Sequence, residues 1–161
     1  MIKGAWRIEQ LQLRNQDRRV DVDANGNLTF VDDVITTSAR LDALTRKEMV
    51  FFIPGNQAVG ANKEGIDIYA PFNMAILNAH IALDTAPTGS DFIVDINKGG
   101  TTIFTTQANR PTIVDGANSG TSGTPDITNL VQNDIITIDV DQVGSTTPGT
   151  NLTVQVRCRI L

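Results

Sequence analysis

The chain has 161 residues and a net charge of −5, a length that suits one domain or one domain with a small appendage. Its single cysteine excludes an intrachain disulfide framework and a cysteine-based zinc site, and its single histidine leaves little for a histidine-rich metal site. The acidic balance argues against a nucleic-acid-binding protein, which usually has a basic face, and no apolar run is long enough to cross a membrane.

The charged residues are distributed unevenly. Residues 1–48 hold 8 Lys/Arg and 8 Asp/Glu, whereas residues 49–161 hold 5 and 10 and are rich in Thr, Ile, Val, Gly and Asn. The second composition is typical of a β domain with many turns. The change predicts a boundary near Glu48, between an N-terminal attachment or oligomerisation segment (1–48) and a β domain (49–161).

The N-terminal segment contains one strong hairpin signal. Apolar residues alternate over 20–22 and again over 28–30, with Asn25-Gly26 between them. A short helix is predicted over 38–48, because Ser38 is a candidate N-cap. So few apolar residues make a poor autonomous core. We therefore expect this segment to gain its order from another copy of the chain or from a partner surface.

The second part reads as short strands separated by turns. Strands are predicted over residues 49–53, 64–70, 91–97, 101–106, 127–131, 134–143 and 151–161. Residues 72–83 are compatible with a helix, but we favour a strand, because no N-cap precedes them and prolines bracket them. Two glycine-rich stretches, 114–126 and 144–149, are predicted loops.

Alternation assigns each strand a core face. The predicted core residues are Ile66, Ile68, Leu77, Ala79, Ile81, Leu83, Ile136, Ile138, Val140, Leu152, Val154, Val156, Cys158 and Ile160. The pattern has no βαβ alternation, and so many short strands indicate an all-β fold. We expect an antiparallel β-sandwich of jelly-roll type, preceded by a small β-hairpin and linker.

The stretch Asp91–Phe104 contains two carboxylates, an amide and two glycines. Read as a calcium loop, it has Asp95 and Asn97 at positions 1 and 3. Position 5 is Gly99, which offers no side-chain ligand, and position 12 is Thr106 in place of the required Glu. We favour a hairpin that turns at the two glycines and leaves its carboxylates on the solvent face. Its predicted core face holds Phe92, Val94 and Ile96.

Asp134, Asp139 and Asp141 form a second acidic group near the C-terminus. Asp139 and Asp141 are expected on one face of a strand, about 7 Å apart. They can bind a cation, pair with Arg157 or Arg159 on a neighbouring strand, or form a solvated face, and the solvated face is the reading we favour. No pair of carboxylates is marked out for glycoside hydrolysis, which needs an acid in an apolar pocket.

The remaining candidates for chemistry are isolated. His80 has no serine or cysteine nucleophile motif beside it, and Gly116–Gly120 lacks the lysine and helix of a phosphate loop. Cys158 falls in an apolar stripe and is expected to be a buried thiol. Trp6 is either a residue of a small core or an interface anchor. We therefore expect a non-enzymatic protein without metal or cofactor.

Several stretches, in order, resemble a module recurrent in tailed-phage virion proteins. They are Thr85–Ser90, Ile93–Lys98, Gly100–Thr106, Asn109–Ile113, Asp139–Ser145 and Pro148–Val154. The resemblance covers roughly residues 50–161. It does not specify one part of the virion, since similar modules are attached to tail fibres, baseplate parts and head-surface proteins.

The resemblance implies a jelly-roll β-sandwich, commonly a homotrimer, on the outer surface of a virion assembled in the host cytoplasm. A short attachment segment before one such module fits a head decoration (cement) protein, which binds the major capsid protein and ties capsomers together. The alternative is a short tail-fibre or baseplate component that contacts tail proteins and a host surface glycan. Neither role involves nucleic acid or membrane. The predicted attachment residues are Trp6, Arg7, Arg14, Arg18 and Arg19.

Overall fold

A computed structural model of the chain describes residues 18–22, 25–26, 28–32 and 44–161. The chain divides into two units, Met1–Leu44 and Thr45–Leu161, and we call the second unit the β domain. Its first strand begins at Arg46. The expected boundary near Glu48 therefore lies a few residues inside this strand.

The N-terminal unit contains the expected hairpin. Strand β1 (Arg18–Val22) pairs antiparallel with β2 (Leu28–Asp32), and Gly26 in the connecting turn has a φ of +84°. The helix expected over 38–48 is wrong at its end, because residues 46–48 belong to a strand. Backbone pairing with the C-terminal strand decides their conformation over a local helical pattern. Residues 38–43 lie outside the described ranges.

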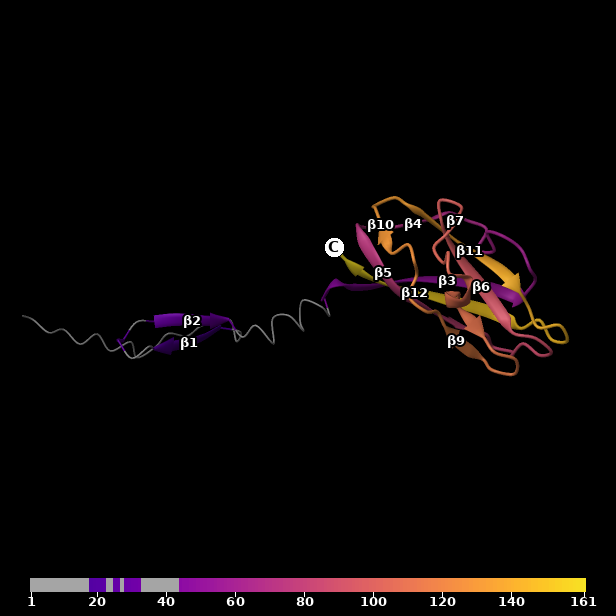
Figure 1. Ribbon diagram of the computed structural model, residues 1–161, viewed down its shortest axis with the longest axis horizontal. Coiled ribbons are helices and arrows are strands. Elements are labelled where there is room, and N and C mark those ends of the chain that lie inside the picture. Colours follow the sequence, from indigo (N-terminus) through magenta and orange to yellow (C-terminus); the bar gives the residue numbers. More distant parts are fainter. Residues whose placement is uncertain (1–17, 23–24, 27, 33–43) are drawn as a thin grey trace, which may run out of the picture. The chain divides into compact units, whose positions relative to one another are not determined.

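The β domain is built around one antiparallel sheet (Figure 1). Its long strands are β3 (Arg46–Asn56), β5 (Met74–Ala82), β6 (Phe92–Lys98), β11 (Ile135–Gln142) and β12 (Thr150–Ile160). Its short strands are β4 (Ile68–Tyr69), β7 (Thr101–Thr102), β8 (Thr112–Ile113), β9 (Ser119–Thr121) and β10 (Asn129–Leu130). One turn of 3-10 helix, η1 (Gln107–Asn109), interrupts the strands. The expected all-β antiparallel class is confirmed.

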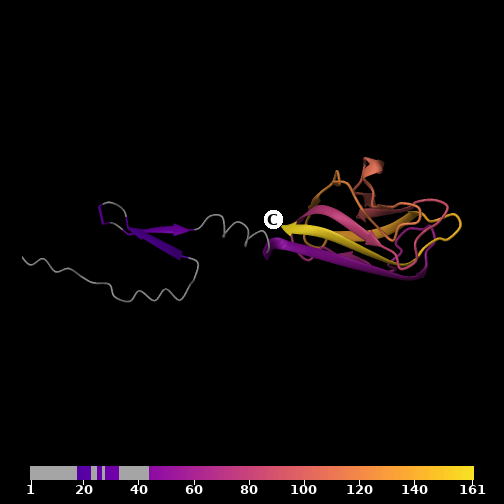
Figure 2. The ribbon, with the colours of Figure 1, turned by 90° about the horizontal axis from the view of Figure 1, so that it is seen from below.

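The sheet runs in the order β3-β12-β5-β9-β8-β6-β11-β4 and curls on itself. The long strands β3, β12 and β5 lie side by side in one half (Figure 2), and β6, β11 and β4 form the other half. Buried side chains from both halves form a single core, in which Phe92, Phe104 and Met74 are the largest of the fully buried side chains. Burial of this apolar surface is the main term that stabilises the domain.

Most of the predicted core faces are confirmed, and Leu77 is a correction. Ala79 and Ile81 are buried as expected, but the Leu77 side chain is 39% exposed. The register explains this: Arg157 of β12 lies opposite Asn78, and Cys158 lies opposite Ile76, so Leu77 is the extra residue of a β-bulge. A bulge reverses the alternation of the strand, which simple periodicity does not reveal.

The strand expected over 64–70 is reduced to β4, two residues long, and Ile66 is 64% exposed. The segment before β4 lies along β11 instead. The Gly60 and Val140 backbones exchange hydrogen bonds of 2.9 Å, and the Lys63 amide donates to Ile138 O at 2.8 Å. These bonds occupy part of the β11 backbone. Only residues 68–69 therefore pair with β11 as a strand, although apolar residues alternate over 64–70.

The glycine-rich stretch 114–126 contains a strand that the sequence did not suggest. Strand β9 pairs with β5 and, through Thr121, with Thr112 of β8, so it joins the two halves of the sheet. A Cβ at Gly120 would lie 1.8 Å from the Thr112 carbonyl oxygen. Only glycine allows this approach of two backbones. Across the described ranges, no helix is long and apolar enough to span a membrane.

Candidate functional site

The stretch Asp91–Phe104 forms the expected hairpin. Strand β6 pairs antiparallel with β7, and the turn residues Gly99 and Gly100 have φ values of +55° and +79°. The three side chains expected in the core are fully buried; they are Phe92, Val94 and Ile96. Local turn chemistry and a period of two therefore identified this element correctly.

Asp95, which was predicted to lie on the solvent face of this hairpin, is buried, and so is Asn97 on the same face, which corrects the prediction. Asp95 is 8% exposed and Asn97 is 7% exposed. The Asp95 carboxylate accepts hydrogen bonds from the Ile96 amide and the Thr102 hydroxyl, both at 2.8 Å. Desolvation raises the pKa of Asp95 even though these bonds lower it. At Asp95 and Asn97 this face is therefore not a wet surface.

The acidic residues of β11 are tied to their own half of the sheet. The Asp139 carboxylate accepts a 2.8 Å hydrogen bond from the Asn62 amide, and Asp141 forms an ion pair with Arg110. The expected alternative of pairing with Arg157 or Arg159 is wrong. Strand β12 pairs with β3 and β5, whereas β11 pairs with β6 and β4.

An open hollow of about 450 Å³ lies beside these acids and is lined by Asp67, Asp139, Asn62 and Asn97, among others. Glu64 nearby has a raised pKa, chiefly from desolvation and further from the charges of Asp139 and Asp67, while hydrogen bonds from the backbone oppose the shift. In the part of the chain that the structure describes, no three His, Cys, Asp or Glu side chains are placed to hold a metal ion.

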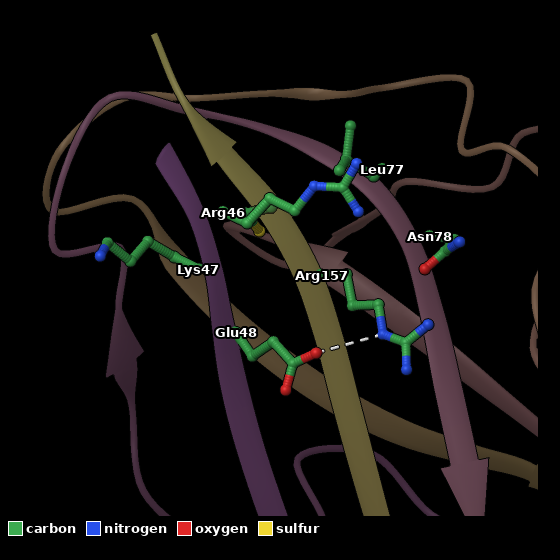
Figure 3. A pocket seen from close by; sticks show the side chains of 7 residues that line it. Arg46, Lys47, Glu48, Leu77, Asn78 and Arg157 are labelled. Carbon is green, nitrogen blue, oxygen red and sulfur yellow. Dashed lines mark hydrogen bonds and ion pairs between the residues drawn. The ribbon is translucent and has the colours of Figure 1, made fainter. Parts of the chain in front are cut away.

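A second pocket, of about 220 Å³, opens on the outer face of the β3–β12–β5 half (Figure 3). The side chains that line it are Arg46, Lys47, Glu48, Leu77, Asn78, Arg157 and Cys158. The Arg157 guanidinium donates to Glu48 Oε1 at 3.2 Å. The bulge that turns Leu77 outward gives this pocket an apolar wall. The buried Asn78 Oδ1 has no hydrogen-bond partner. The basic rim suits an anionic group of a binding partner.

Basic residues gather around this pocket, and we call them the basic end of the domain: Arg46, Lys47, Arg157 and Arg159. Arg46 and Arg159 lie directly opposite each other on β3 and β12. Like charges in a cross-strand pair are unfavourable. Glu48, two residues after Arg46 on β3, forms an ion pair with Arg157. Among the described residues, this end holds four basic side chains and one side-chain carboxylate, so its charge favours the approach of negative groups.

The opposite end of β3, β12 and β5 is made of three loops, 84–91, 114–118 and 143–150, which we call the acidic tip. The Gly89 amide donates to Asp115 Oδ1, Gly116 donates to Pro87 O, and Thr88 donates to Thr147 O. These loops contain three carboxylates and no Lys or Arg. Because β3 has 11 residues, the tip lies about 34 Å from the basic end.

Between the two ends, the outer face of this half of the sheet carries no Lys, Arg, Asp or Glu. We call it the outer strip: Val50, Phe52, Thr153, Gln155, His80, Ala82, Ser119 and Thr121. Val50 and Phe52 are 56% and 59% exposed. This surface was not predicted from the sequence. The run Met49–Ile53 indicates it, because the even-numbered residues of this strand are as apolar as the odd-numbered ones, so one apolar set must face outward.

The other isolated candidates have structural positions. His80 is half-buried in the outer strip. Cys158 is buried, as expected, and desolvation raises the pKa of its thiol to about 11. In Gly116–Gly120, the Asn118 side-chain amide donates hydrogen bonds to Leu83 O and Asp84 O, just after β5. The stretch then leads into β9.

The predicted attachment residues fall in the N-terminal unit. Trp6, Arg7 and Arg14 lie outside the described residues. Arg18 and Arg19 lie in β1, opposite Asp32 and Val31 of β2. Their role in attachment stays a prediction.

No protein-family model matches the chain, and no curated protein matches its sequence. The assignment of a function therefore rests on the residues, the surfaces and the resemblance of short stretches described above.

Proposed function

We propose that this chain is a non-enzymatic structural protein of a tailed-phage virion, and that it decorates the head, where it binds the capsid and stabilises contacts between capsomers. In this proposal the β domain is a jelly-roll-type module, displayed on the outer surface of the virion, and the N-terminal unit attaches it. The chain works as a homo-oligomer, for which the family resemblance implies three copies.

One observation carries this proposal. The stretches that resemble virion modules all fall within the β domain, in its core strands and connecting turns. Ile93–Lys98 lies in β6, and Gly100–Thr106 covers the end of the hairpin turn, β7 and the segment after it. Asn109–Ile113 runs to the end of β8, and Asp139–Ser145 and Pro148–Val154 lie on either side of the β11–β12 turn. The resemblance thus follows a folded unit. The curl of the sheet around one core further supports a jelly-roll module.

The division of the chain suggests the experiment. Residues 1–44 are removed, so that β3 stays whole, and the truncated protein is added to particles that lack this protein. We expect binding to be lost while the β domain keeps its β-rich circular dichroism spectrum. A second variant, in which the five predicted attachment residues become alanine, tests the named side chains. Undiminished binding of the truncated protein contradicts the proposal.

The acidic tip supports a second candidate, a short tail-fibre or baseplate component that contributes to host recognition. Its three loops are fastened to one another by hydrogen bonds, at the end of the domain opposite Arg46, where the chain enters the first strand. Loops held on a rigid scaffold are common recognition surfaces. Purified protein that labels host cells at micromolar concentration would favour this candidate.

The number of copies per particle separates the two candidates. A head decoration protein that covers the capsid lattice is present in hundreds of copies. A tail-fibre or baseplate component is present in a few to a few dozen. Quantitative mass spectrometry of purified particles, scaled to the major capsid protein, makes this measurement.

A further inference from the structure

The outer strip differs from an ordinary solvated sheet face. Antiparallel sheets with one wet face usually alternate apolar residues inside with polar and charged residues outside. Here four neighbouring strands, β3, β12, β5 and β9, contribute eight outward residues without a single charged carboxylate, lysine or arginine. Depletion of charge together with exposed aromatic and aliphatic side chains is characteristic of the centre of a protein–protein interface.

The edge of the sheet beside this strip is protected against pairing with another strand. Among the described strands, β3 pairs with β12 alone, so it is an edge strand of the sheet. Near one end of β3, Pro54 has no backbone N–H to donate to an added strand. Near the other end, Lys47 alternates onto the same face of β3 as the buried Met49 and Phe51. Its side chain extends away from β12 (Figure 3). Both features oppose edge-to-edge association. A partner is therefore expected on the face of the strip and not along its edge.

The charges at the two ends of the strip indicate what the partner is. Arg159 lies beyond one end of the strip, and Asp84 lies beyond the other. Both point to the outer side of the sheet, because each is two residues from an outward residue of its own segment, Arg157 for Arg159 and Ala82 for Asp84. They are eight residues apart along the strand direction, about 27 Å. Two copies packed face to face and antiparallel bring each basic end over the acidic tip of the other copy. A parallel or three-fold arrangement through the same face brings like charges together.

We propose that the outer strip is the contact between two copies of this chain, which pack face to face about a two-fold axis. The contact is isologous, so each copy contributes the same residues. Val50 and Phe52 supply its most exposed apolar side chains, and the basic pocket of one copy receives carboxylates of the acidic tip of the other. An assembly built through this contact holds an even number of copies. A trimer formed elsewhere on the chain would pair into a hexamer.

The test uses the full-length protein and measures its mass in solution by analytical ultracentrifugation and native mass spectrometry. We expect an even number of copies. The V50E/F52E variant places charges in the apolar part of the contact, so it should weaken self-association about 30-fold or more and should halve the number of copies. The matched control is V59E/I66E, which replaces two equally exposed apolar residues outside the strip. It should keep the mass of the wild type.

A charge-reversal pair tests the orientation. D84K and R159E should each weaken self-association, and the double variant D84K/R159E should restore it, because the two sites are too far apart to interact within one copy. D67K, an exposed reversal on the other half of the sheet, is the control. The inference is overturned by a wild-type mass of one or three copies, by an unchanged mass of V50E/F52E, or by a double variant no better than the single ones. The result does not depend on whether the protein belongs to a virion.

Discussion

The Thr102 hydroxyl donates a 2.8 Å hydrogen bond to the carboxylate of Asp95, across the glycine turn that joins β6 to β7. The same hydroxyl oxygen accepts a 3.0 Å hydrogen bond from the Phe104 amide. Thr102 therefore links a nearly buried carboxylate to the start of the segment that carries the buried Ile103 and Phe104. The polar residues of this hairpin thus form an internal hydrogen-bond network that holds β6 and β7 together.

Replacement of Thr102 by valine should destabilise the β domain by about 1–3 kcal/mol, because it removes a donor from a buried carboxylate. Urea unfolding followed by circular dichroism measures the change. Thr101 is exposed and lies next to it in the same strand, so Thr101→Val is the matched control and should change stability little. Equal effects of the two substitutions would contradict this role of Thr102.

The raised pKa of Asp95 gives a pH dependence with a defined sign. Burial raises the pKa in the folded state above the ordinary value of 3.8, so the folded protein holds the proton more tightly than the unfolded chain. This contribution to stability is fully present below pH 3.8 and is lost as the pH rises through the folded pKa. Asp95→Asn keeps an oxygen that accepts both hydrogen bonds. The stability of Asp95→Asn relative to wild type should therefore increase with pH from about pH 4 upward. A flat difference contradicts the assignment.

Replacement of Gly120 by alanine should disrupt the junction between the halves of the sheet. The new Cβ would lie 1.8 Å from the Thr112 carbonyl oxygen, and that backbone has no flexible end to move away. We expect a loss of about 3 kcal/mol or more in the free energy of unfolding. Ser119→Ala, at an exposed position of the same strand, serves as control and should cost little. Unfolding in denaturant compares the two variants with wild type.

The Cys158 thiol should be inert in the folded protein. Its pKa is raised from 9.0 to about 11 by burial, and the thiolate is the reactive form. Ellman's reagent at pH 8 should react slowly with native protein and rapidly after unfolding. As the pH rises from 9 to 11, the unfolded thiol ionises first, so the folded state loses stability. Cys158→Ala should lack this component. Rapid labelling of folded protein would show that the thiol is accessible.

The position of the boundary has a measurable consequence. Deletion of residues 1–44 leaves β3 complete, whereas deletion of residues 1–48 also removes three paired residues and the Glu48–Arg157 ion pair. The shorter protein should therefore melt a few degrees lower than the protein truncated at residue 44. Thermal unfolding of the two truncated proteins compares them directly. Equal melting temperatures would place the boundary at Glu48, as the composition alone suggested.

Several parts of the fold could be read from the sequence because they depend on neighbours in the chain. The N-terminal hairpin follows from Asn25-Gly26, and the β6–β7 hairpin follows from Gly99-Gly100. The alternation of Leu152 to Cys158 identified β12 and its buried face, since a strand in a one-sided sheet has a period of two. The absence of a complete calcium loop was also visible in the spacing of the ligands.

Other parts depend on contacts between segments far apart in the chain, and only the tertiary structure decided them. The bulge at Leu77 becomes visible only when β12 is laid beside β5. Asp95 reads as a solvent-facing residue until β7 is paired with β6 and Thr102 is placed against the carboxylate. Strand β9 exists because Gly120 lets two backbones approach.

The outer strip and its charged ends likewise combine residues from four strands. The sequence by itself determined the β class and the local turns, because these are properties of short stretches. The tertiary structure decided which carboxylates are buried, how far the sheet curls and which apolar residues remain exposed, because pairing between distant strands fixes which face of each strand meets the core.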